Sequence, residues 1–243
     1  MPLWFAGLVL VTAIAAGATA SVVGFGIGSL LTPIIAIRLG TDIAIVAVAL
    51  PHLAGGLLRG WRLRQFVDRW VIIRFGLLSA AGGLLGALVF ARLSPLALST
   101  TLGALLLLTA AAGLTGWSEY WRPRGPLVWL MGALSGFFGG VAGNQGGMRA
   151  AALTTLGLVS VSFVATSTAI GIMIDLVRTP VYLLGHGGSL SGLWGLVSLA
   201  AAGVLAGTLV GQRMLLGLSP ERFRLVISAA IGLLGLWLLT RGH

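Results

Sequence analysis

The chain has 243 residues, of which 58% are hydrophobic and 8% are charged, and its mean hydropathy is +1.06. Soluble domains carry about 25% charged residues, so this composition excludes an ordinary soluble protein and predicts one that crosses a bilayer several times. The formal net charge is +10 and there is no cysteine, which excludes disulfides, thiol catalysis and thiolate metal sites.

The first half of the chain predicts five helical segments, separated by short turns that contain glycine, proline or arginine. They span residues 3–23, 27–38, 42–58, 70–91 and 95–116. A glycine cluster, Gly24-Phe-Gly-Ile-Gly28, interrupts the first pair of segments. The stretch Gly60–Trp70 places aromatic side chains among arginines, and it predicts an amphipathic helix that lies on the inner leaflet.

The second half predicts five further segments, again two pieces that flank a glycine break and then three longer helices. They span residues 127–142, 145–158, 160–184, 191–213 and 221–240. A second glycine cluster, Gly139–Gly147, interrupts the first pair. A segment such as 145–158 is shorter than the roughly 20 residues that a full span needs. Each broken pair is therefore either a re-entrant hairpin or two short tilted spans, and the sequence leaves both open.

Residues 17–114 and 132–239 look like diverged copies of one unit. The glycine-bearing stretch 17–28 aligns with 132–143, and both copies later contain a Gly-x-Leu-Val motif and then Leu-Ser-Pro. A paired interruption of hydrophobic segments is the best sequence pointer to the substrate site of a membrane transporter. The repeat therefore predicts both an architecture and a place for the site.

The loop charges predict how the two copies are oriented. The arginine-rich stretch Arg59–Arg74 is expected in the cytoplasm, whereas its counterpart Leu184–Leu190 carries no formal charge. Equivalent loops then fall on opposite faces, which is typical of inverted-topology repeats. We expect an all-α polytopic membrane protein in which each repeat has a glycine-broken helix pair and three transmembrane helices. The first repeat covers residues 1–116, a linker covers 117–126, and the second repeat covers 127–243.

Three motifs carry a resemblance to a known family. They are Gly24-Phe-Gly-Ile-Gly-Ser-Leu-Leu-Thr-Pro33, the cluster Gly136–Gly147, and Ala165-Thr166-Ser167 on the next helix. In these motifs and over nearly its full length the chain resembles the TauE/SafE family of membrane permeases, also described as sulfite-exporter-like proteins. The resemblance implies transport of small sulfur-containing anions, such as sulfite and sulfonates.

The sequence departs from the family pattern at three places. Ser29 stands where the family often has another glycine, and Met148-Arg149 follows the second cluster, which lacks the proline. Ala49-Leu50-Pro51-His52 takes the place of the Ala-Thr-Ser motif in the first half. The substrate therefore does not follow from the motifs alone.

The two breaks predict the anion site. A helix that begins inside the membrane has unpartnered N–H groups and the positive end of its dipole, and glycine lets an oxyanion approach the backbone. The alternative is that glycine only allows close helix packing, and that Ser and Thr bond their own helix backbone. The predicted binding residues are Gly24, Gly26, Gly28, Ser29, Thr32, Asn144, Gln145, Gly146, Gly147, Arg149, Thr166 and Ser167.

Charged residues within apolar runs are the other candidates. Arg149 suits an oxyanion, or alternatively extends to a nearby membrane interface. Asp175 and Arg178 lie three residues apart on one helix and are expected to pair; in the functional alternative Asp175 takes up a proton or releases Arg178 as the anion arrives. His52 has a pKa range suited to proton coupling, although a membrane histidine is often only hydrogen-bonded to a neighbour.

The leading hypothesis is a secondary transporter that exports sulfite, an organosulfonate or another small anion across the cell membrane by alternating access. A passive anion channel and, as a weaker alternative, an intramembrane enzyme are the competing hypotheses. We expect the lipid bilayer and a small anion as partners, without nucleic acid, cofactor or metal site. The coupling ion, a proton or Na⁺, stays open, as do the direction of transport and the oligomeric state.

Overall fold

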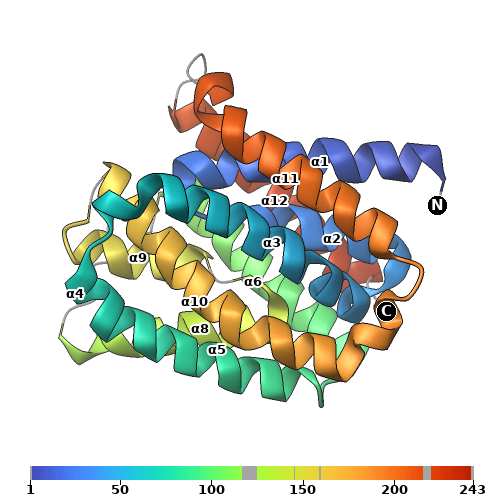
Figure 1. Cartoon of the computed structure of the whole chain (residues 1–243), viewed down its shortest axis with the longest axis horizontal. Coiled ribbons are helices and arrows are strands. Elements are labelled where there is room, and N and C mark those ends of the chain that lie inside the picture. The colour runs from blue at the N-terminus through green and yellow to red at the C-terminus, as the bar shows by residue number, and fades with distance from the viewer. Residues whose placement is uncertain (1, 117–124, 145, 159, 216–219, 242–243) are drawn as a thin grey trace.

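The computed structural model describes residues 2–116, 125–144, 146–158, 160–215 and 220–241, which are almost entirely helical and form no strand (Figure 1). The helices of the first half are α1 (Leu3–Val23), α2 (Ile27–Leu39), α3 (Thr41–Leu63), α4 (Arg69–Val71), α5 (Leu77–Phe90) and α6 (Pro95–Thr115). A π-helical turn, Ile72–Gly76, joins α4 to α5. The helices of the second half are α8 (Pro126–Ala142), α9 (Gly146–Thr155), α10 (Ser160–His186), α11 (Trp194–Leu215) and α12 (Pro220–Arg241).

The described residues include six helical segments that are long and apolar enough to cross a membrane. They are Leu3–Val23, Thr41–Phe66, Arg69–Phe90, Pro95–Thr115, Val161–Leu190 and Trp194–Gly211. The expectation of an all-α polytopic membrane protein is confirmed. By contrast α2 and α9 have 13 and 10 residues, so they extend about 20 and 15 Å and do not cross the roughly 30 Å hydrocarbon core.

The predicted amphipathic helix over Gly60–Trp70 is wrong. Its first residues continue α3, a 3-10 turn covers Arg64–Phe66, and the chain is extended at Val67. Asp68 explains the break, because its carboxylate accepts a hydrogen bond from Val71 N at 3.0 Å and so caps the next helix. The exposed aromatic residues of this stretch remain suited to a membrane interface, where arginine stacks on them, as the Arg64 guanidinium does 5.3 Å from the Trp61 ring centre.

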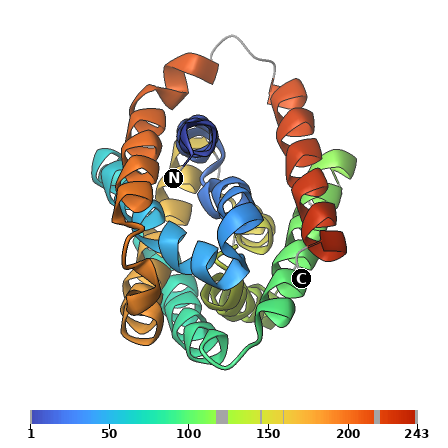
Figure 2. The same ribbon diagram turned by 90° about the vertical axis from the view of Figure 1, so that its right-hand side faces the viewer.

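Glycine allows two long helix contacts that involve both halves of the chain. Helix α1 packs mainly against α11, and α5 packs mainly against α8. A Cβ on Gly17 would collide with the carbonyl oxygen of Val204, and a Cβ on Gly136 would collide with that of Ser79. Small residues at such contacts let helix backbones approach closely, which is how helices associate in lipid. Figure 2 shows α12 beside α6, on the other side of the bundle from α11.

Helices α3 and α10 lie side by side near the middle of the bundle (Figure 1). They run antiparallel, because His52 of α3 contacts Asp175 of α10 while Arg59, further along α3, contacts the earlier Thr168. The arginine-rich end of α3 and the short turn Gly187–Leu190 after α10 therefore lie at opposite ends of the bundle. Both breaks pack beside this central pair, which places the candidate site at the core.

Candidate functional site

The first break occurs where α1 ends and α2 begins. Gly24 caps α1 with a φ of 83°, and Gly26 precedes α2 with a φ of 127°. Both angles lie in a region that side-chain-bearing residues rarely adopt, so glycine is required for the turn. The sequence therefore predicted this break correctly, and the start of α2 lies inside the protein, where Ile27 and Gly28 are buried.

The second break has the same form. Gly143 caps α8 with a φ of 70°, and α9 begins at Gly146 after Asn144. Gln145, a predicted binding residue, lies outside the described residues. The side chain of Asn144 is buried, and its Nδ2 has no hydrogen-bond partner among the described residues.

The two breaks meet, although they are more than 100 residues apart in the sequence. The Ser29 hydroxyl donates to Asn144 Oδ1 at 3.1 Å. A Cβ on Gly28 would collide with the carbonyl oxygen of Gly143, and one on Gly146 would collide with the ring of Phe25. Thr32, one turn after Ser29, is buried, and its hydroxyl has no partner in the part of the chain that the structure describes. Ser29 and Asn144, one predicted polar residue from each break, therefore come together.

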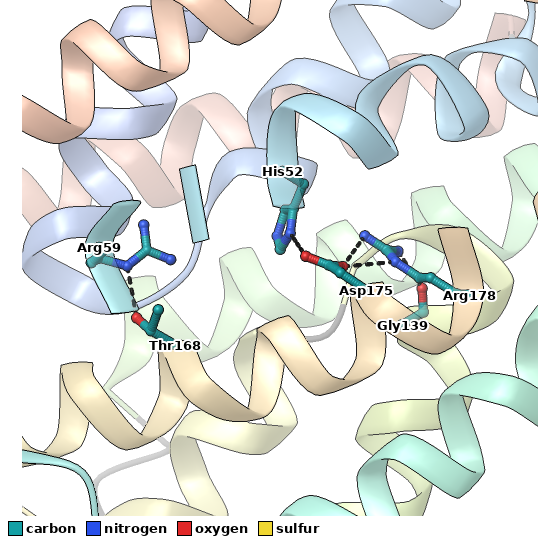
Figure 3. A network of polar contacts seen from close by, with 6 residues as sticks. All are labelled: His52, Arg59, Gly139, Thr168, Asp175 and Arg178. Carbon is teal, nitrogen blue, oxygen red and sulfur yellow. Dashed lines mark hydrogen bonds and ion pairs between the residues drawn. The ribbon is translucent and has the colours of Figure 1, made fainter. Parts of the chain in front are cut away.

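Asp175 lies at the centre of a buried polar network between α3 and α10 (Figure 3). One carboxylate oxygen, Oδ1, accepts from Arg178 Nε at 2.9 Å and lies 2.8 Å from Arg178 Nη2. The other, Oδ2, lies 2.6 Å from His52 Nδ1. All three side chains are buried, so the expected Asp175–Arg178 pair is present and His52 joins it from the other helix.

Arg178 also holds the end of α8. Its Nη1 donates to the carbonyl oxygen of Gly139 at 2.6 Å, and the Tyr182 hydroxyl donates to that of Gly140. The last carbonyls of a helix lack partners within it and carry the negative end of its dipole, so a cation is favourable there. Arg178 therefore links the charged network to the second break, with Nη1 3.4 Å from where a Cβ on Gly143 would lie.

Arg149 is buried between the first break and α10. Its Nε donates to the Ser167 hydroxyl at 3.1 Å, and that hydroxyl donates to the carbonyl oxygen of Gly24 at 3.3 Å. Gly171 leaves room for the guanidinium, because a Cβ there would lie 3.6 Å from Nη1. With 2% of its surface exposed, Arg149 does not extend to a membrane interface.

Arg59 is the residue that the sequence analysis misplaced. Expected in the cytoplasmic loop, it lies within α3, is 5% exposed, and donates from Nε to the Thr168 hydroxyl at 2.7 Å (Figure 3). Its Nη1 is buried without a hydrogen-bond partner among the described residues. One signal was present: Arg59 follows His52 by seven residues, or two helical turns, so the two share a face of α3.

A small cavity connects these groups. Its lining includes the predicted residues Gly24, His52, Arg149, Ser167 and Asp175, together with Arg59 and Thr168. The free space is about 10 Å³, enough for roughly one water molecule. Arginine exceeds carboxylate among these lining residues, so the cavity has a net positive lining.

The remaining predicted residues lie elsewhere. Gly28, Ser29, Asn144 and Gly146 belong to the contact between the two breaks and do not line the cavity. Gly26 precedes α2 and Thr32 lies within it, and neither is among the lining residues of the cavity. Gly147 is the second residue of α9. Thr166 faces the arginine-rich end of α3, where its hydroxyl accepts from Asp68 N at 2.9 Å. The structure thus separates the prediction into a cavity with charged walls and a neighbouring contact between helix starts.

Comparison with known proteins agrees with this architecture. No curated protein and no solved structure matches the chain. One family model, described as Sulfite exporter TauE/SafE, matches residues 9–238 and so covers nearly the whole chain, both breaks and the central helices included. The chain therefore belongs to the TauE/SafE sulfite exporter family of membrane transporters.

Proposed function

We propose that the protein is a secondary transporter that exports a small anion, with sulfite or an organosulfonate as the substrate. The observation that carries this proposal is the pair Arg59 and Arg149, which are both buried and both line a cavity beside the first helix break. A guanidinium fork matches the oxygen atoms of a sulfite or sulfonate group. Buried ionised residues in a membrane protein are functional candidates by default.

The charges around the cavity favour an anion over a cation or a neutral solute. Asp175, the carboxylate of the described lining, is engaged by Arg178 and His52. The Arg59 Nη1 atom is a buried donor without an acceptor among the described residues, and such groups cost free energy until an acceptor arrives. An oxyanion supplies both the acceptor and the negative charge.

The cavity supports a carrier more than a channel. Space for about one water molecule does not admit an ion with four heavy atoms, so the walls must separate before the anion enters. A continuous pore would need no such separation. We therefore propose alternating access, in which the substrate site opens to one side of the membrane at a time.

The packing of the helices supports inverted repeats as the basis of this movement. If the repeats make α1 equivalent to α8 and α5 equivalent to α11, the contact of α1 with α11 is equivalent to that of α8 with α5. The contacts of α3 with α10 and of α6 with α12 each join two equivalent helices, so exchanging the halves leaves them unchanged. This exchange of partners is the pattern of a two-fold axis that relates the first half to the second. One half can then rock against the other around the site between them.

The coupling ion belongs to the same proposal. His52 and Asp175 form a buried pair at the cavity wall, so a proton taken up there would add positive charge beside the anion. We therefore propose proton coupling, with Na⁺ as the alternative. The plasma membrane is the proposed location, with the arginine-rich end of α3 in the cytoplasm.

Counterflow of labelled sulfite into proteoliposomes tests the proposed function. If the protein is a carrier, vesicles loaded with unlabelled sulfite should accumulate the label transiently, because each inward movement of labelled sulfite needs an outward movement of unlabelled sulfite. The rate of uptake should saturate with sulfite concentration. A flux that grows linearly with concentration and shows no counterflow would indicate the competing passive channel. If a folded protein moves no sulfite, methanesulfonate is the next anion to test, and sulfite is removed as the substrate.

A further inference from the structure

A second cavity lies beyond Arg59, at the arginine-rich end of α3. Its volume is about 150 Å³, so it is much larger than the central cavity, and it is lined by Ser21, Arg59, Arg62, Leu63 and Thr208. These residues come from α1, α3 and α11. Arg62 also lines a third, more open space with Trp61 and Arg64. Arg59 thus borders both the central cavity and this second one.

Two residues that line the second cavity each carry a buried polar atom with no hydrogen-bond partner among the described residues. The atoms are Nη1 of Arg59 and Oγ1 of Thr208, and each residue is 5% exposed. The neighbouring Ser21 hydroxyl is already used, because it donates to the carbonyl oxygens of Gly17 at 3.0 Å and Thr208 at 3.2 Å. A cation and a hydroxyl that both lack an acceptor fit a small oxyanion, which accepts from both.

We propose that this second cavity is an anion subsite in series with the central one, on the arginine-rich side of the protein. Arg59 contacts the anion in both positions, Thr208 holds it in the outer position, and the exposed Arg62 attracts it from solution. This inference rests on the proposed function for its direction of flow. The outer subsite itself binds a sulfonate or sulfite group whether or not the central site turns over.

The absence of cysteine from the chain allows a direct test of this subsite. The variant Thr208→Cys is treated with two methanethiosulfonate reagents of similar size, the anionic sulfonatoethyl and the cationic trimethylammonioethyl compound. A cavity lined by Arg59 and Arg62 should make the anionic reagent react at least roughly tenfold faster. Methanesulfonate should slow this reaction, because it occupies the same subsite.

Three comparisons make the result specific. Leu63→Cys, in the same cavity, should behave like Thr208→Cys, whereas Ala91→Cys, on an exposed turn at the other end of the bundle, should show neither the preference nor the protection. Adding Arg62→Gln to Thr208→Cys should reduce the preference. Adding Arg149→Gln should leave it unchanged, because Arg149 does not line the outer cavity.

The outcomes distinguish the subsite from the proposed function. Equal rates for the two reagents at both cavity positions, or no protection by methanesulfonate, would overturn the subsite even if sulfite counterflow is observed. Anionic preference with protection in a protein that shows no counterflow would support the subsite and count against the transport proposal. In a transporting protein, Thr208→Val should raise the half-saturating concentration about tenfold on the arginine-rich side alone.

Discussion

Arg59, Arg149 and Arg178 are all buried, yet their contacts give them different tasks. Arg178 pairs with Asp175 and binds the last turn of α8, so its charge is used within the fold. Arg59 and Arg149 line the central cavity and donate from Nε to hydroxyl groups, Thr168 and Ser167 respectively. These hydroxyl groups orient the two guanidinium groups and carry no charge of their own.

The sequence predicted Arg149 and Asp175 because each interrupts an apolar run. It did not predict Arg59, because this residue begins a series of arginines that continues into the loop, and loop arginines are usually explained by topology. Only the continuation of α3 to Leu63, which α10 supports through Thr168, moves Arg59 into the interior. That extension depends on tertiary contacts that a hydropathy pattern does not contain.

Replacing Asp175 tests whether the network is structural. Asp175→Asn leaves the buried Arg178 without its carboxylate, and breaking a buried ion pair from one side costs about 3–5 kcal/mol. The double variant Asp175→Asn with Arg178→Gln should lose clearly less stability than the two single losses added together. Thermal unfolding of the purified protein in detergent measures all three, and additive losses would show that the two side chains do not depend on each other.

His52 predicts a pH dependence with a definite sign. It contacts Asp175 on α10, and Arg59, Arg149 and Arg178 are the other charged groups around it. Protonating His52 adds positive charge beside the cavity, so a bound anion favours the protonated form and protonation favours the bound anion. Affinity for methanesulfonate, which keeps one charge throughout, should therefore rise as the pH falls below neutral.

The half-saturating concentration for methanesulfonate, measured above and below neutral pH, checks the prediction. His52→Gln should make it independent of pH. An unchanged dependence in both His52→Gln and Asp175→Asn would remove these residues from proton coupling and leave Na⁺ as the ion to test.

At the level of elements, the glycine clusters predicted where the helices break, and the positive φ angles of Gly24, Gly26 and Gly143 give the reason. The pairing of the two halves was less predictable. The sequence match aligns Gly28 with Gly143. In the structure the residue that caps α1 as Gly143 caps α8 is Gly24, which lies one helical turn before Gly28. Small residues recur along all these helices, so matching letters fix the register only to within a turn.

Gly28→Ala tests the contact between the breaks. The new methyl group would collide with the carbonyl oxygen of Gly143, so α2 and the second break must move apart at a cost of about 1–3 kcal/mol. Gly7→Ala on α1 is the matched control, because nothing lies within 4 Å of its added Cβ, and it should be neutral or slightly stabilising. Equal melting temperatures for the two variants would mean that the breaks are not in tight contact.

At the level of the whole molecule, the glycine contacts of α1 with α11 and of α5 with α8 join the first half of the chain to the second. Neither half forms these contacts alone, because each contact takes one helix from each half. The long helices were predictable from hydropathy within a few residues. Which helix of one half packs against which helix of the other was not predictable, because this depends on which glycine faces which backbone.

The proposed inverted repeats make a prediction about the two faces of the membrane. The turn after α3 and the turn after α10 lie at opposite ends of the bundle, so Gln65→Cys and Ser189→Cys should react with a membrane-impermeant thiol reagent from opposite sides. In intact cells Gln65→Cys should not react with the reagent added outside, because arginine-rich loops such as this one are retained in the cytoplasm. Labelling of both positions from one side would contradict this topology.

Sulfite counterflow tests directly whether the anion binds in the central cavity, when the wild type is compared with Arg59→Gln, Arg149→Gln and the exposed control Arg92→Gln. We expect saturable exchange in the wild type and in Arg92→Gln. Each cavity variant should lose at least about tenfold in kcat/KM, because an anion buried beside a lost charge partner costs about 2–5 kcal/mol. Normal counterflow in folded Arg59→Gln and Arg149→Gln would contradict the account, because the anion would then bind somewhere other than the cavity between α3 and α10.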